Sequence, residues 1–171
     1  MNESVGRNEN RTEGNPGYAA FEVPMDLARR ACLISRTPAS ELGLPEGPSL
    51  EGMLVEQTED LAAAVRHLAS RRSGCCLVLI NFDDFAKESI VFDLLRRLRT
   101  RSPNLPVILL SRSFRADDLS QERLVIADIS LVAPIADIRL IGPALMAAAA
   151  NNAAWRKRRR GLMLEKTRQM N

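Results

Sequence analysis

An unbroken apolar run, CCLVLI, occupies residues 75–80 and is followed at once by a polar residue, Asn81. A strand with one face in water alternates apolar and polar residues, but this run does not alternate, so both of its faces must be buried. Strands of this kind are typical of parallel sheets that are covered by helices on both sides. The run therefore predicts a central strand of a parallel α/β sheet.

Other short apolar runs alternate along the chain with segments of helical periodicity. Residues 36–52 are rich in proline and glycine, and residues 112–124 are polar, so we expect at most short helices there. Repeated strand–helix units imply an open, doubly wound α/β domain with a parallel sheet. We predict strands at 31–35, 53–56, 75–80, 106–110 and 129–132, and helices at 60–70, at 89–100 and from between 138 and 143 to about Arg160.

The two shorter helices have clear apolar faces. Asp60 is expected to cap the first helix, whose apolar residues are spaced three and four apart. The inward residues of this helix are expected to be Leu61, Ala64, Val65 and Leu68. In the helix at 89–100 we expect Val91, Leu94, Leu95 and Leu98 to face inward, and Arg96, Arg97, Arg99 and Arg101 to face outward.

Charge is unevenly distributed along the chain. The 24 basic and 21 acidic residues give a net charge of +3. Residues 151–171 carry +6 and the remainder carries −3, so the basic character is confined to one end. We divide the chain into a polar segment at 1–24, expected to be disordered or loosely attached, an α/β domain at 25–155, and a basic C-terminal helical extension at 156–171.

Several classes of function have no support in the sequence. The longest apolar run, 144–150, is far shorter than the roughly 20 residues that span a bilayer, and no signal peptide is recognisable, so we expect a cytoplasmic protein. Zinc-site spacing is absent from the three cysteines, and the single histidine, His67, is expected to be exposed. No glycine-rich phosphate loop or Ser-His-Asp set is present. We expect no metal, no cofactor and no enzymatic activity.

Residues 93–111 read DLLRRLRTRSPNLPVILLS, with LVLIN before them and ISLVAP after them. This pattern resembles the response-regulator receiver domain, the CheY-like domain of bacterial two-component phosphorelays, over about residues 30–155. The resemblance implies a flavodoxin-like, five-stranded parallel sheet with strand order 2-1-3-4-5. It also implies a phosphorylation pocket at the carboxyl ends of the strands. The pocket of that family holds an acidic pair, a phospho-accepting Asp, a Thr or Ser, and a Lys.

The chain departs from the family at most pocket positions. Arg36 and Thr37 replace the acidic pair, and Asn81 replaces the acceptor. Ala133 replaces the lysine, whereas Ser111 is retained. Aspartyl phosphorylation needs a carboxylate nucleophile, carboxylates that hold Mg²⁺, and a cation that neutralises the phosphoryl group. The resemblance therefore implies a pseudo-receiver that signals through protein–protein interaction, independently of phosphorylation.

Two acids that follow the third strand leave an alternative open. If the strand register shifts by two residues, Asp83 becomes the acceptor and the chain becomes a conventional receiver. We prefer Asn81 as the equivalent position because the apolar run ends directly before it. We also consider that the Arg36 guanidinium reaches Asp83 or Asp84 and holds the pocket in one state; the alternative is that Arg36 points to solvent.

The final helix is rich in small residues and is expected to end before Gly161. Its face either packs on the sheet or, with the last strand, forms a surface for a partner or a homodimer, because receivers commonly associate through these elements. The partner is expected to be a signalling protein. Candidate interface residues are Leu140, Leu145, Met146, Ala149 and Trp155.

A run of five basic residues follows Trp155 and has three interpretations. It could be a solvated helix end whose cations complement the helix macrodipole. It could contact the phosphates of a nucleic acid, which would make the protein a nucleic-acid-binding regulator. It could also face an anionic membrane surface. The run consists of Arg156, Lys157, Arg158, Arg159 and Arg160.

Overall fold

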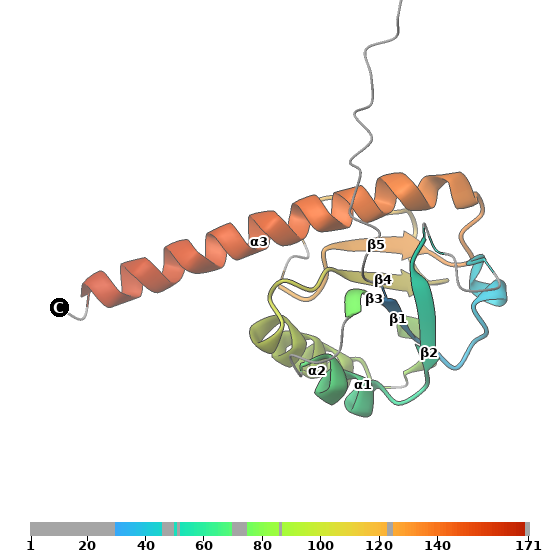
Figure 1. The fold of residues 1–171 in the computed structure, drawn as a ribbon, viewed down its shortest axis with the longest axis horizontal. Coiled ribbons are helices and arrows are strands. Elements are labelled where there is room, and N and C mark those ends of the chain that lie inside the picture. Colours follow the sequence, from blue (N-terminus) through green and yellow to red (C-terminus); the bar gives the residue numbers. More distant parts are fainter. Residues whose placement is uncertain are drawn as a thin grey trace, which may run out of the picture.

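A computed structural model describes residues 30–45, 50, 52–69, 75–85, 87–122 and 125–169, so the predicted N-terminal segment lies outside the described residues. Five parallel strands form one sheet in the order β2-β1-β3-β4-β5 (Figure 1). The predicted fold class and strand order are confirmed. The strands are β1 (Arg30–Ile34), β2 (Leu54–Thr58), β3 (Cys75–Asn81), β4 (Val107–Ser111) and β5 (Ile129–Val132).

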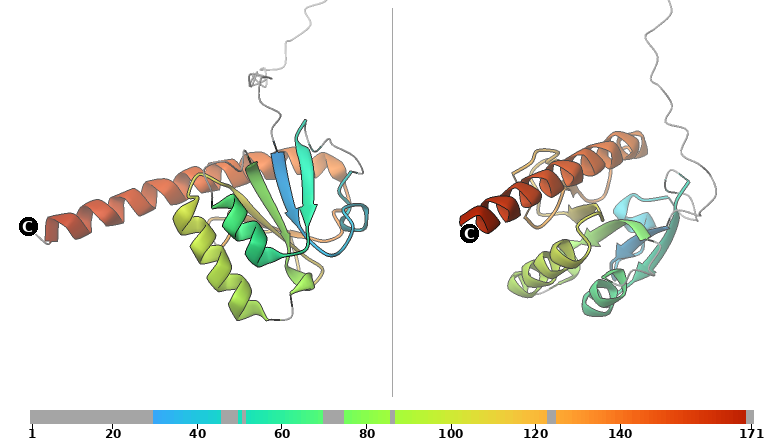
Figure 2. Two further views of the ribbon diagram at one scale, coloured as in Figure 1. Left: turned by 60° about the horizontal axis from the view of Figure 1, so that its bottom comes forward. Right: turned by 60° about the vertical axis from the view of Figure 1, so that its left-hand side comes forward.

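Within the described ranges, three α-helices cover the sheet: α1 (Leu61–Leu68), α2 (Glu88–Arg101) and α3 (Ile141–Gln169). Helices α1 and α2 lie on one face, and α3 crosses the other (Figure 2). Short 3₁₀ turns are η1 (Ser40–Leu42), η2 (Phe82–Asp84) and η3 (Ile138–Leu140). As predicted, the described residues between β4 and β5 contain no helix, and η1 is the one helical turn described between β1 and β2.

Alternate residues of the central strands enter two separate cores. Leu79 and Ile108 pack on the side of α3 with Ala144. Their neighbours Ile80 and Leu109 pack on the side of α1 and α2. Burying one such side chain contributes about 1.5–3 kcal/mol, so both faces stabilise the sheet. This double burial explains why the run at 75–80 does not alternate.

Helix α1 follows the predicted pattern. The Asp60 carboxylate accepts a hydrogen bond from the N–H of Ala63 at 2.8 Å, which satisfies one free donor of the first turn. The four residues expected to face inward are all buried: Leu61, Ala64, Val65 and Leu68.

Two predictions about helices are wrong. Arg99 does not face outward: its side chain is 1% exposed and forms an ion pair with Asp128. The position lies at the edge of the inward face of α2, where α3 covers it through Trp155. In addition, α3 does not end before Gly161 but continues to Gln169. A single exposed glycine costs about 1 kcal/mol in a helix, which disfavours the helix without ending it, and residues 162–164 that follow are good helix formers.

Gly43 joins two loops that approach the same end of the sheet. It has φ of +73°, and a Cβ at this position would collide with the main chain of Ile135. The N–H of Ile135 donates to the carbonyl oxygen of Leu42 at 2.9 Å, so the two backbones are held in close approach. Only glycine meets both the conformational and the steric requirement.

We expect Gly43→Ala to lower the free energy of unfolding by about 1–2 kcal/mol more than Gly52→Ala. Gly52 has a similar φ of +77°, but a Cβ at this position would meet no atom within 4 Å, so it reports the conformational cost alone. Urea unfolding of both variants measures the difference. Equal losses would show that the contact with Ile135 is not close enough to matter.

Candidate functional site

The carboxyl ends of β1, β3 and β4 meet at one edge of the sheet, which is where open α/β sheets bind ligands. Asn81 is the last residue of β3, and Asp83 and Asp84 lie in the η2 turn that follows. Residues 35–37 follow β1, and Ser111 ends β4. The structure therefore brings together the residues predicted for the pocket from three strands.

The Asp84 carboxylate binds the segment that follows β1, an arrangement that we call the Asp84 latch. Its Oδ2 accepts from Ser35 Oγ and from the N–H of Arg36, both at 2.7 Å, and from the N–H of Thr37 at 3.3 Å. Its Oδ1 accepts from Thr37 Oγ1 at 3.0 Å. Burial alone would raise the pKa of Asp84, but these donors outweigh burial and hold the pKa below its ordinary value.

Asn81 supports the latch from within the core, since it is 2% exposed. The hydroxyls of Ser35 and Thr37 both have the Asp84 carboxylate as an acceptor, so they offer lone pairs on their other side. The Asn81 Nδ2 donates to these two oxygens, at 3.4 Å and 3.2 Å. Asn81 Oδ1 is buried and has no hydrogen-bond partner among the described residues. Position 81 thus requires a hydrogen-bond donor, which an ionised aspartate cannot be.

Asp83 binds a different strand. Its Oδ1 accepts from Ser111 Oγ, and its Oδ2 accepts from the N–H of Arg112 at 2.7 Å. Ser111 Oγ also lies 2.7 Å from Ser113 Oγ and accepts from the N–H of Ser113 at 3.0 Å. The two adjacent acids therefore hold η2 between β1 and β4, one to each side.

The donor set does not fit the magnesium ion that phosphorylation in a conventional receiver would require. Hard cations prefer several carboxylate oxygens in one place, whereas the Asp83 and Asp84 carboxylates accept from separate groups of N–H and O–H donors. Among the described residues, no group of three or more Asp, Glu, His or Cys side chains is arranged to hold a metal ion. Ala133, which the resemblance places at the position of the family's lysine, is buried and offers only an uncharged methyl group.

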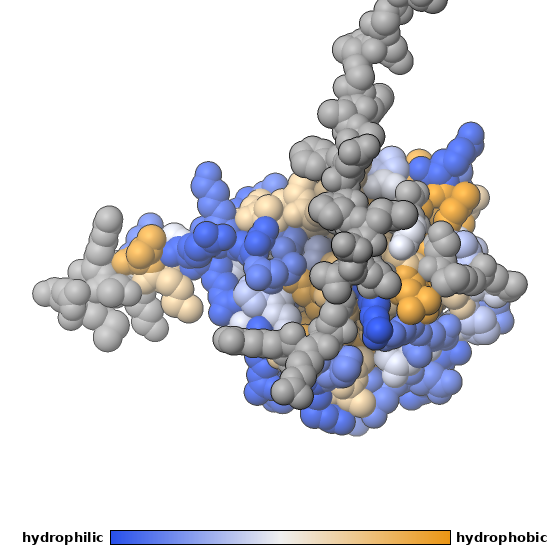
Figure 3. Space-filling view, in the orientation of Figure 1, coloured by the Kyte–Doolittle hydropathy of each residue, from blue (hydrophilic) through white to orange (hydrophobic). Residues whose placement is uncertain are grey.

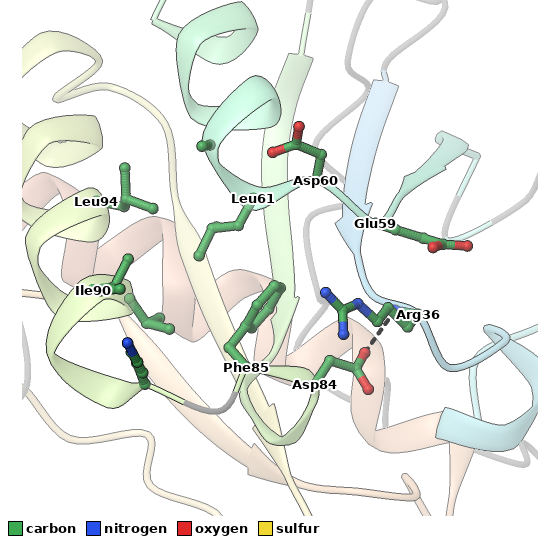
Figure 4. A pocket seen from close by; sticks show the side chains of 11 residues that line it. Arg36, Glu59, Asp60, Leu61, Asp84, Phe85, Ile90 and Leu94 are labelled. Carbon is green, nitrogen blue, oxygen red and sulfur yellow. Dashed lines mark hydrogen bonds between the residues drawn. The ribbon is translucent and has the colours of Figure 1, made fainter.

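Of the two alternatives considered for Arg36, the guanidinium contact with Asp83 or Asp84 is wrong, and the residue is exposed. Arg36 does reach Asp84, but through its main-chain N–H, and no ion pair joins its guanidinium to a described carboxylate. The side chain instead lines an open cavity of about 630 Å³ between the amino ends of α1 and α2. Figure 4 shows Asp84 beside Arg36, with Phe85 and Leu61 forming an apolar wall.

Two contributors to the latch were not predicted from the sequence. Ser35 supplies a hydroxyl to Asp84, and Gln57 of β2 donates to the carbonyl oxygens of Ser35 and Thr37, each at 3.0 Å. Ser35 offered a signal, because it is the polar residue that closes an apolar strand, like Asn81. Gln57 offered none, since it is one polar residue on an edge strand.

The interface candidates differ in accessibility. Leu140, Met146 and Ala149 are exposed, but Leu145 packs partly against the core. Trp155 is half-buried, with the Arg99 guanidinium 5.3 Å from its ring centroid. The surface expected on α3 is thus smaller than predicted.

The basic run does not lie at a helix end, because α3 extends nine residues beyond Arg160, so the macrodipole interpretation for α3 itself is wrong. Arg156 donates to Asn104 and Arg158 donates to Gln121. Arg159 donates to the carbonyl oxygens of Arg99 and Thr100, at the carboxyl end of α2. Lys157 and Arg160 are exposed.

The single histidine and one of the cysteines lie outside this site. His67 is exposed, as predicted. Burial raises the pKa of the Cys32 thiol to about 12, which keeps the sulfur protonated at neutral pH.

Within the described residues, no helix combines the length and the apolar character needed to cross a bilayer. No protein-family model matches the chain, and no curated protein is found to be similar to it.

Proposed function

We propose that this chain is a pseudo-receiver: a cytoplasmic, non-enzymatic signalling protein, related to bacterial two-component receivers, that binds another protein without being phosphorylated. The fold and the strand order are consistent with a receiver-like sheet. The observations that support the proposal further are chemical, and they come from the pocket.

The observation that supports this function best is the Asp84 latch. In a conventional pocket, free carboxylates hold Mg²⁺ beside the acceptor. Here the Asp84 carboxylate accepts four hydrogen bonds, from Ser35, Arg36 and Thr37. At the position that corresponds to the phospho-accepting aspartate stands Asn81, a buried amide that donates hydrogen bonds. The pocket is thereby held in one hydrogen-bonded state, which suits a protein that binds its partner constitutively.

Phosphorylation at Asp83 has less support. It would require breaking the bonds of this carboxylate to Ser111 and Arg112. The position of the family's lysine, which neutralises the phosphoryl group, holds the uncharged Ala133. The pocket therefore favours a protein that is not phosphorylated.

A nucleic-acid-binding role for the basic run also has less support, because proteins that bind single strands stack the bases on aromatic side chains. The aromatic residue that precedes the run, Trp155, is half-buried next to the guanidinium groups of Arg99 and Arg159. Exposed Met146 and Ala149 on α3 are available to a signalling partner or to a second copy.

We expect no phosphorylation when the chain is incubated with acetyl phosphate and Mg²⁺. Phosphate-affinity gel electrophoresis measures the modified fraction, with a conventional receiver treated in parallel as the positive control. A partner, once isolated, should bind equally well with and without the phosphodonor.

A shifted band that disappears in Asp83→Asn but persists in Asp84→Asn would overturn the proposal. That result would instead establish Asp83 as a phospho-acceptor and the chain as a conventional receiver.

A further inference from the structure

A groove lies where α3 leaves the domain, between this helix and the turn that follows α2. It has a volume of about 570 Å³. The projecting part of α3 places hydrophobic residues beside strongly hydrophilic ones on the surface (Figure 3). The apolar residues of the groove are Pro103, Met163 and Leu164, and its basic residues are Arg156, Arg159 and Arg160.

The positive charge of this groove is not neutralised within the described part of the chain. None of its three arginines forms an ion pair with a described carboxylate. The neighbouring acid on α3, Glu165, is exposed and forms no such pair there either. Three guanidinium groups around apolar side chains therefore present a surface that is complementary to acidic groups.

Contacts with the domain hold two arginines of the groove in place. The Arg159 guanidinium lies 5.5 Å from the centroid of the Trp155 ring, which also has the Arg99 guanidinium at 5.3 Å. Arg159 is fixed further by the two carbonyl oxygens at the end of α2, and Arg156 by Asn104. An arginine has five N–H donors, so these contacts leave others for a ligand. Side chains that are already ordered lose little entropy on binding.

The shape and lining of the groove argue against nucleic acid and lipid. Proteins that bind single strands stack the bases on aromatic side chains, and no residue lining the groove is aromatic. Helices that lie on membranes have one apolar face. The apolar residues 162–164 are consecutive, so they spread over roughly 200° of the helix. A flat bilayer would also not reach the floor of a concave surface.

We propose that this groove binds an acidic segment of a partner protein, with carboxylates on Arg156, Arg159 and Arg160 and an apolar side chain on Met163 and Leu164. The proposal rests on the proposed function, because it gives the chemistry of the partner that a pseudo-receiver would bind. Interfaces of this kind are anchored by arginine and by a small apolar centre.

The test selects random dodecapeptides displayed on phage against the immobilised full chain. We expect enrichment of sequences that combine Asp and Glu with Leu, Ile, Met or Phe. The strongest peptide is then synthesised, and its affinity is measured from the fluorescence of Trp155, the one tryptophan of the chain. Binding should weaken with salt, as it does for partly exposed charge pairs.

Arg160→Glu should weaken binding about tenfold. The matched control is Lys157→Glu, which makes the same change of charge at an exposed position outside the groove and should weaken binding less than about threefold. Met163→Gln tests the apolar contact without changing charge and should also weaken binding. The side chains of Arg160 and Lys157 are both exposed, so these variants are expected to fold, which circular dichroism checks.

Equal losses in Arg160→Glu and Lys157→Glu, or selection of peptides without acids, would overturn the proposal. So would single-stranded DNA or phosphatidylserine vesicles that bind more tightly than the peptide and depend on Arg160. Labelling with a phosphodonor tests the pocket alone, whereas peptide selection tests the groove alone. A result that overturns the acidic-segment proposal therefore leaves the pseudo-receiver proposal standing, and the reverse also holds.

Discussion

Arg99→Met is expected to lower the free energy of unfolding by about 3–5 kcal/mol, because it leaves a buried carboxylate without its cation. The Arg99 guanidinium donates two parallel bonds to Asp128, at 2.8 Å and 2.9 Å, and both side chains are almost completely buried. Asp128 also accepts from the N–H of Val107 at 2.7 Å, so the pair joins α2 to the starts of β4 and β5. Burial raises the pKa of Asp128, and without Arg99 it should rise further.

The matched control is Arg97→Met, which removes an exposed arginine from the same helix. It should change stability by less than about 0.5 kcal/mol, as most surface substitutions do. Urea unfolding measures both variants. The double variant Arg99→Met/Asp128→Asn should lower the free energy of unfolding by less than the sum of the effects of Arg99→Met and Asp128→Asn, because it leaves no unpaired charge. Additive losses would show that the two side chains do not interact as the structure indicates.

Asn81→Asp, which introduces the acid that the receiver resemblance implies at this position, should lower the free energy of unfolding by about 3 kcal/mol at neutral pH. The new carboxylate would face the lone pairs of Ser35 and Thr37 and lie near Asp84, in a position that is 2% exposed. Introducing a carboxylate at position 81 alone therefore works against the latch.

The pH dependence of Asn81→Asp separates charge from shape. Burial beside an acid raises the pKa of the new carboxyl group above its unfolded value of about 3.9. At a pH below the unfolded pKa, the new carboxyl group is neutral in both the folded and the unfolded state, so burying its charge costs nothing. This cost grows as the pH rises from the unfolded pKa to the folded pKa. The difference in the free energy of unfolding between Asn81→Asp and wild type should thus become smaller as the pH falls toward about 4.

The control is Asn81→Leu, which removes the hydrogen-bond donor without adding charge. It should lower the free energy of unfolding by less, and by the same amount at every pH. A pH-independent gap for Asn81→Asp would contradict the arrangement of donors around position 81.

Local patterns in the sequence predicted the elements well, because they depend on nearest neighbours. The non-alternating run at 75–80 indicated a strand buried on both faces, and Asp60 marked the start of α1. The position of Asn81 at the end of β3 also followed from the end of an apolar run. Gly161 misled, because glycine ends a helix only where the chain turns, and here it does not.

Contacts between segments far apart in the chain could not be predicted from the sequence. Asp84 meets residues 47 to 49 positions earlier, through the hydroxyls of Ser35 and Thr37 and through the main-chain N–H groups of Arg36 and Thr37. Every residue type except proline possesses such an N–H group. No residue pattern could therefore indicate that Arg36 would bind through its backbone. Arg99 was placed outward because helical periodicity gives the direction of a side chain but not what covers it.

The sequence by itself determined the parallel α/β architecture, since apolar periodicity decides which faces of strands and helices must be buried. It also determined which side chains stand at the carboxyl ends of the strands. Only the tertiary structure decided how these side chains are used, because the acids of η2 accept from donors on both sides. It also decided that Arg159 binds the carboxyl end of α2 and that α3 continues beyond the domain. These outcomes depend on strand register and on the angle at which helices pack, which bring together groups far apart in the chain.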